Sequence, residues 1–167
     1  MKRLILVLLL LSFPALAEGP QPFSRGSWQQ LREQHAGRPT IVHFWGVTCG
    51  PCLAELPRWG EFIREKPGAV IVLVSADPVM AEENIVTGAL AKAGCAAAEN
   101  WMFADPFTER LVYEVDPNWG GELPYTVLIG ADASMTAILG EVNFSELRAW
   151  ATRQGKPAIG GRSSRSE

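Results

Sequence analysis

The apolar positions of the chain alternate between short unbroken runs and sets with helical spacing. Thr40–Trp45 and Ala69–Val74 are unbroken runs of β-branched, aromatic and aliphatic residues, which is typical of strands buried on both faces of a parallel sheet. Between them, Cys52–Lys66 repeats apolar residues at helical spacing. These three segments therefore predict a β-α-β unit with a right-handed crossover.

Further elements are predicted on both sides of this unit. The expected helices are Ser27–His35, Val79–Ala93, a segment from Asp105 to about Tyr113, and a last helix that begins at Asn143 with a capping-box pattern to Glu146. The expected strands are Trp101–Ala104, Tyr125–Ile129 and Met135–Leu139, the last two compatible with a hairpin. Parallel strands thus come first and an antiparallel pair last, so the order predicts an α/β fold with helices for both faces of one sheet.

The N-terminus has the pattern of a secretory signal peptide. Lys2 and Arg3 precede the apolar run Leu4–Leu11, and Ala15-Leu16-Ala17 is a small-x-small cleavage pattern. An uncleaved membrane anchor is the alternative, although the apolar run is shorter than the roughly 20 residues that span a bilayer. The predicted organisation is a signal peptide over residues 1–17, one domain over 18–155 and a flexible tail over 156–167, with a periplasmic or otherwise exported location.

Composition narrows the classes of partner. The chain has 15 basic and 18 acidic residues and a formal net charge of −3. No basic patch predicts nucleic-acid binding, and no second apolar run predicts a membrane span. Three cysteines allow at most one intramolecular disulfide, and export points to a compartment in which disulfides persist.

Two of these cysteines, in the segment WGVTCGPC (Trp45–Cys52), lie where a buried strand meets the start of a helix. A helix N-terminus stabilises a thiolate, because its free N–H groups and its dipole favour negative charge. Cys49 is therefore expected to be the nucleophile, and Cys52, one turn further and deeper, to resolve a mixed disulfide.

Two other roles are possible for the cysteine pair, a structural disulfide and a zinc site. A structural disulfide across so short a loop would constrain the unfolded chain very little and would be a weak crosslink. A structural zinc site needs four ligands, and the further candidates are only His35, His43 and Cys95, with no second Cys-x-x-Cys. No stable metal and no cofactor are expected.

The segment FWGVTCGPC, the Leu123-Pro124 pair before a strand, and the terminal hairpin and helix together resemble the thioredoxin superfamily. Its TlpA-like branch, with ResA and the cytochrome c maturation reductases, is similar in three respects: Cys52–Pro57 fits C-x-x-E-x-P, a helix is inserted near Val79–Ala93, and a leader is present. The resemblance covers roughly Phe23–Gln154. It implies a thioredoxin fold with a central mixed sheet, flanking helices and one inserted helix.

The resemblance also assigns roles to single residues. Cys49 would attack and Cys52 would resolve, forming a redox-active disulfide. Pro124 would be a cis-proline facing the dithiol, the alternative being an ordinary trans turn proline, and Leu123 would offer its backbone to an extended peptide. The residues expected to bind substrate are Trp45, Gly50, Pro51 and Leu123.

Two titratable residues are added to the expected catalytic set. Glu55, one helical turn after Cys52, would exchange a proton with that thiol if buried; a solvated helix glutamate is the alternative. His43 stands where thioredoxin has a buried aspartate, and it either relays protons and tunes Cys52 or is a satisfied core histidine. Thr48 replaces the tryptophan usual before the first cysteine, so partner preference is expected to differ.

The sequence allows more than one role for two further features, Cys95 and the segment Trp119-Gly120-Gly121. Cys95 is expected to be a buried, inert thiol, with a third redox thiol as the alternative. Trp119-Gly120-Gly121 precedes the Leu123-Pro124 loop and is a candidate for part of a substrate lip.

The predicted function is that of a periplasmic protein-disulfide reductase, which would receive electrons from a membrane thiol carrier of the DsbD/CcdA type. Its partners would be oxidised proteins, with cytochrome c biogenesis as one candidate pathway. The alternatives are a disulfide-donating oxidase or isomerase and, on a different principle, a copper-binding chaperone with the same fold.

Overall fold

The structure is a computed structural model that describes residues 19–77 and 82–154. The predicted signal peptide and C-terminal tail lie outside the described residues, as does the beginning of the helix predicted at Val79–Ala93. Within the described part, no helix has both the length and the apolar character needed to cross a membrane.

Six strands form one mixed sheet in the order β1-β4-β3-β2-β5-β6. They are β1 Gln21–Phe23, β2 Thr40–Trp45, β3 Val70–Ser75, β4 Glu99–Phe103, β5 Tyr125–Ile129 and β6 Met135–Leu139. The first four pair in parallel, β5 is antiparallel to β2, and β6 is antiparallel to β5. The predicted α/β class, the β-α-β unit and the terminal hairpin are therefore confirmed.

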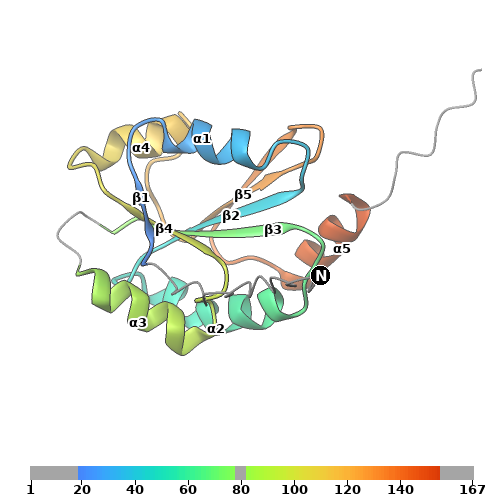
Figure 1. Cartoon of the computed structure of the whole chain (residues 1–167), viewed down its shortest axis with the longest axis horizontal. Coiled ribbons are helices and arrows are strands. Elements are labelled where there is room, and N and C mark those ends of the chain that lie inside the picture. Colours follow the sequence, from blue (N-terminus) through green and yellow to red (C-terminus); the bar gives the residue numbers. More distant parts are fainter. Residues whose placement is uncertain (1–18, 78–81, 155–167) are drawn as a thin grey trace, which may run out of the picture.

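Helices cover both faces of this sheet, as Figure 1 shows. They are α1 Ser27–Gln34, α2 Gly50–Arg64, α3 Glu83–Ala93, α4 Thr108–Val115 and α5 Phe144–Gln154. Helices α1 and α4 pack on one face, and α2, α3 and α5 contribute to the core on the other. The inserted helix expected from the resemblance is α3.

Strand β2 lies in the middle of the sheet and serves both cores, because successive side chains of a strand point to opposite faces. Val42 and Phe44 pack with α1 and α4, while Ile41 and Trp45 pack under α2. All four are completely buried, and each such side chain contributes about 1.5–3 kcal/mol of burial free energy.

Helices α2 and α3 approach closely at Gly60. A Cβ atom on Gly60 would fall well inside contact distance of the Ala93 backbone carbonyl. Only a glycine lets the two helix backbones come this near at that point.

Several predicted boundaries differ for local reasons. Strand β1 was missed, because it has only three residues, contains Pro22 and pairs with β4 alone. Helix α4 begins at Thr108 rather than near Asp105, whose carboxylate accepts a hydrogen bond from the Phe107 N–H in a turn. Leu53, one of the apolar residues at helical spacing within Cys52–Lys66, is 42% exposed and lies off the buried face of α2.

The helix caps also differ in detail from the prediction. The residue before α1 is Gly26 in a left-handed conformation, and Ser27 is the first helical residue. Asn143 does cap α5, since its Oδ1 accepts from the Ser145 N–H. Glu146 reaches the Asn143 side chain at 3.3 Å, so the reciprocal half of the capping box does not go to the backbone.

Candidate redox site

The two motif cysteines form a disulfide at the N-terminus of α2. Cys49 is the residue before the first helical turn, with an extended backbone, and its Sγ accepts a hydrogen bond from the Cys52 N–H at 3.2 Å. Cys49 is partly exposed, whereas Cys52 is completely buried. An external reagent can therefore reach the first sulfur and not the second.

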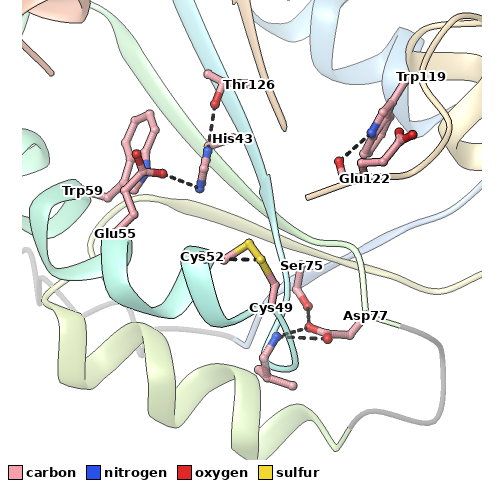
Figure 2. The surroundings of a disulfide bond; sticks show 11 residues. His43, Cys49, Cys52, Glu55, Trp59, Ser75, Asp77, Trp119, Glu122 and Thr126 are labelled. Carbon is pink, nitrogen blue, oxygen red and sulfur yellow. Dashed lines mark hydrogen bonds and ion pairs between the residues drawn. A yellow bond between two sulfur atoms is a disulfide. The ribbon is translucent and has the colours of Figure 1, made fainter. Parts of the chain in front are cut away.

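The loop that presents Cys49 is held by Asp77, at the end of β3 (Figure 2). Both carboxylate oxygens of Asp77 accept from the Val47 N–H, at 3.0 and 2.9 Å, and Ser75 Oγ donates to Oδ2 at 2.6 Å. Asp77 is only 2% exposed. Hydrogen bonds to a buried charged group are among the stronger ones in proteins, so this contact fixes the loop between β2 and α2.

Gly46 makes this contact possible. A Cβ atom at Gly46 would lie 3.0 Å from Asp77 Oδ1 and 3.3 Å from Leu123 Cδ1. The loop is thus packed between Asp77 on one side and the Leu123-Pro124 segment on the other. Asp77 was not identified from the sequence, because an aspartate before a proline (Pro78) is the ordinary pattern of a turn.

Replacing Asp77 with alanine is expected to lower the free energy of unfolding by about 2 kcal/mol, because the Val47 N–H loses its acceptor in a buried place. Thiol exchange through Cys49 should slow as the loop loosens. Chemical denaturation and stopped-flow exchange with a small disulfide measure the two effects. Asp77→Asn, which keeps one acceptor oxygen, should lie between the alanine variant and the wild type; equal losses in both variants would contradict this account.

The Leu123–Pro124 peptide bond is cis, as the resemblance implied. Leu123 is partly buried and packs against the core on both faces of the sheet. It brings this segment against Gly46, three residues before Cys49. The cis-proline segment and the cysteine loop are therefore neighbours, although they lie far apart in the sequence.

Two tryptophans expected near substrate are core residues instead. Trp45 is completely buried under α2, and its predicted role in binding substrate stays a prediction. Trp119 is 6% exposed, stacks on Tyr125 with ring centroids 4.3 Å apart, and donates from Nε1 to the Glu122 carbonyl. Trp119 packs beneath the loop that leads to Pro124 and does not form an exposed edge of a substrate site. Gly50 and Pro51, by contrast, are exposed.

Glu55 is buried in the core, so the interpretation as a solvated helix glutamate is wrong. Its side chain is 2% exposed. Oε1 accepts from the Val142 N–H at 2.7 Å and Oε2 accepts from Trp59 Nε1 at 3.2 Å. Burial raises the pKa of Glu55, while these two hydrogen bonds oppose that rise.

His43 lies against Glu55 on the same side of the sheet. It is completely buried, Nδ1 pairs with Thr126 Oγ1 at 2.9 Å, and the ring stacks on Trp59 with centroids 4.4 Å apart. Its Nε2 faces Glu55 Oε2 at 3.8 Å and has no hydrogen-bond partner among the residues that the structure describes. Burial lowers the pKa of His43 to about 3, so the ring is neutral at physiological pH.

Cys95 is a buried thiol far inside the core. It is completely buried, and its Sγ donates to the Leu56 carbonyl at 3.5 Å. Burial raises its pKa to about 12, which removes the thiolate that redox chemistry needs. Within residues 19–77 and 82–154, no three histidine, cysteine or acidic side chains come together in a metal-binding arrangement.

Comparisons with known proteins agree with this geometry. No family model matches the chain. It is 40% identical over 48 residues to sporulation thiol-disulfide oxidoreductase A of Bacillus subtilis (29% of this chain) and 35% identical over 49 residues to a thioredoxin H-type of Oryza sativa subsp. indica (29% of this chain). These matches span only 29% and 40% of the two relatives' own lengths.

Solved structures match much more of the chain. A secreted Mycobacterium tuberculosis disulfide oxidoreductase homologous to E. coli DsbE superposes with a TM-score of 0.59 at 19% identity, over 72% of this chain and 85% of that one. StoA from Bacillus subtilis gives 0.53 at 23% identity, over 69% and 83%. With its six-stranded mixed sheet and the Cys-x-x-Cys pair at the start of α2, the chain has a thioredoxin fold and is similar to thiol-disulfide oxidoreductases of the TlpA/ResA/DsbE-like kind.

Proposed function

We propose that the protein is an exported thiol–disulfide oxidoreductase that reduces disulfides in other proteins. The observation that carries the proposal is the asymmetric pair at the start of α2: a reachable Cys49 at a helix N-terminus, joined to a buried Cys52. Helix N-termini favour thiolates. Several relatives with this fold are named disulfide oxidoreductases, which supports the same chemistry here.

In the reduced protein, the Cys49 thiolate would attack one sulfur of a substrate disulfide. The substrate's other sulfur leaves as a thiolate and takes a proton from water, and a mixed disulfide joins Cys49 to the substrate. Cys52 then loses its proton and attacks Cys49 Sγ, which releases the second substrate thiolate. Two electrons pass from the dithiol to the substrate, and the Cys49–Cys52 disulfide remains.

Glu55 is the group that we propose receives the Cys52 proton. It is buried on the same helix, one turn after Cys52, where side chains at this spacing share a face. Burial raises the pKa of Glu55, which makes its carboxylate a better proton acceptor than that of an exposed glutamate.

Protein substrates suit the open position of the site. Three cavities on the described part of the chain, of about 390, 590 and 660 Å³, are lined by other residues and not by Cys49. The dithiol instead lies beside exposed Gly50 and Pro51 and the Leu123-Pro124 segment. An extended polypeptide that pairs with the Leu123 backbone fits this surface better than an enclosed small molecule.

The redox direction, the electron donor and the compartment belong to the same proposal. Reduction in an oxidising compartment needs a supply of electrons, and a membrane thiol carrier of the DsbD/CcdA type is the donor we propose. The N-terminal leader pattern supports export, as do the secreted proteins of this fold. Maturation of c-type cytochromes is one pathway that would use such a reductase.

The reduction potential of the Cys49–Cys52 pair tests the direction. Equilibrating the protein without its leader in redox buffers should give a value near that of thioredoxin, about −270 mV. A value near about −120 mV would mark a strong oxidant and would replace the reductase with a disulfide donor. That second function has one observation in its favour, because a secreted thiol-disulfide isomerase of Corynebacterium glutamicum shares the fold with a TM-score of 0.54.

A further inference from the structure

We propose that His43 is a positioning residue for Glu55, so that the two side chains hold one proton as a single unit beneath the dithiol. The role of this unit in catalysis rests on the proposed function. The pairing itself is a property of the folded chain and can be tested without turnover.

The starting observation is a buried nitrogen without a hydrogen bond. Within the described part of the chain His43 Nε2 has no hydrogen-bond partner, although the ring is completely buried, and an unpaired polar atom in a core normally costs free energy. The polar atom that it faces is Glu55 Oε2, 3.8 Å away. Figure 2 shows the two side chains pointing toward each other, Glu55 from α2 and His43 from β2. An approach of about 1 Å would make the hydrogen bond.

A neutral imidazole can serve both forms of the carboxyl group. When Glu55 is ionised, the ring proton on Nε2 donates to the carboxylate, and Nδ1 accepts from the Thr126 hydroxyl. When Glu55 is protonated, its O–H donates to Nε2, and the ring proton lies on Nδ1 and donates to Thr126 Oγ1. The two arrangements differ by one proton and by the tautomer. In each of them Nε2 has a partner, which explains a histidine at this position better than an inert core side chain does.

The other contacts of Glu55 keep its carboxyl group in place while this proton comes and goes. The Val142 N–H and Trp59 Nε1 hold the two oxygens, and neither donor titrates. The charged groups that act on Glu55 from outside the pair are Glu141, before α5, and Arg58, on α2. In the reduced protein the Cys52 thiol, one helical turn before Glu55 on α2, titrates as well.

The effect of His43 should fall mainly on the ionised form of Glu55. Burial keeps the His43 ring neutral and raises the pKa of Glu55, so the carboxyl group is the member that titrates. A hydrogen bond from Nε2 to a carboxylate is charge-assisted and stronger than one from a neutral carboxyl group. Removing Nε2 should therefore raise the pKa of Glu55 further.

Two variants separate the two ring nitrogens. In His43→Asn the side-chain amide reaches about as far as Nδ1, so the contact with Thr126 is kept and the group facing Glu55 is lost. In His43→Gln the amide reaches about as far as Nε2, so a donor or acceptor for Glu55 is kept. The Glu55 titration is followed by ¹³C NMR of glutamate-labelled, oxidised protein. We expect a midpoint about one pH unit higher in His43→Asn and one close to the wild type in His43→Gln.

Equal midpoints in the two variants, whether shifted or not, would overturn the proposal, because a histidine that only fills space does not distinguish its two nitrogens. The wild-type protein gives a second test that needs no variant. ¹⁵N shifts of the His43 ring should report a change of tautomer with the same midpoint as the Glu55 signal, and a tautomer that stays fixed through that midpoint would also overturn it.

The rate of disulfide exchange is measured in parallel, and it tests the proposed function and not the pairing of His43 with Glu55. If the wild-type protein exchanges disulfides, the pH profile of the resolving step should move upward in His43→Asn, and this shift should disappear when Glu55→Gln is added. If the titration and the tautomer change are seen while the wild-type protein exchanges no disulfides, the proposed function fails and the paired proton site stands.

Discussion

Replacing Cys49 with serine is expected to abolish disulfide exchange, with a loss of about a thousandfold or more, because a serine hydroxyl stays protonated at neutral pH and is a poor nucleophile. The position of Cys49 explains why no other thiol can take over. Cys52 is completely buried behind it, and Cys95 is buried as well, with a pKa raised to about 12. Reduction of a model protein disulfide, followed by the release of free thiols, measures the loss.

The second cysteine should give a different phenotype. With Cys52→Ser, Cys49 can still attack, but nothing resolves the product, so mixed disulfides with partner proteins should accumulate and be recovered from cells. Cys95→Ser is the matched control, since it removes a thiol that lies outside the motif and should leave exchange unchanged. Recovery of no mixed disulfide would count against protein substrates, and loss of exchange in Cys95→Ser would contradict the inert role of that thiol.

The Gly60→Ala substitution is expected to lower the free energy of unfolding by about 3 kcal/mol, the effect of forcing extra volume into a well-packed place. The new methyl group would meet the Ala93 backbone carbonyl, which a side-chain rotation cannot move aside. Helices α2 and α3 would have to separate, and α2 carries Cys52 and Glu55. Urea denaturation followed by circular dichroism measures the change.

A second helical glycine provides the control. Gly88 lies in α3, is exposed, and has no atom of the described residues within 4 Å of the position where a Cβ atom would stand. Alanine there should stabilise the protein by about 0.5–1 kcal/mol, because it restricts the unfolded chain and favours the helix. The same substitution should thus have opposite signs at the two sites. Stabilisation by Gly60→Ala would show that the two helices are less closely packed than described.

Most of the fold could be predicted from the sequence because its strands have a strong pattern. Strands β2, β5 and β6 begin and end where the sequence predicted, since each is a run of apolar and β-branched residues beside polar or turn residues. Strand β1 carries no such signal in three residues. Strand β4 was predicted to begin at Trp101 but includes Glu99 and Asn100, whose pairing with β3 depends on the neighbouring strand and not on local preference.

The parts of the site that lie within one short segment could be predicted from the sequence. The parts that depend on contacts between separate helices and strands could not. The cysteine pair and its helix follow from neighbouring residues. The contact of Asp77 with the Val47 N–H and the approach of His43 to Glu55 depend on how separate elements pack. The burial of Trp45 had an available signal, because alternation along β2 places it on the same face as Ile41.

Strand β2 packs in the cores on both faces of the sheet, and this has a consequence for how the protein unfolds. The strand contributes to the aromatic core under α1 and α4 and to the core under α2, and the cysteine loop follows directly from its end. Neither core can unfold without exposing side chains of β2 that belong to the other core. The protein should therefore unfold in one cooperative transition. The cysteine loop is thereby anchored to a strand that unfolds only with the whole domain, so its surface is preformed and does not fluctuate by local unfolding.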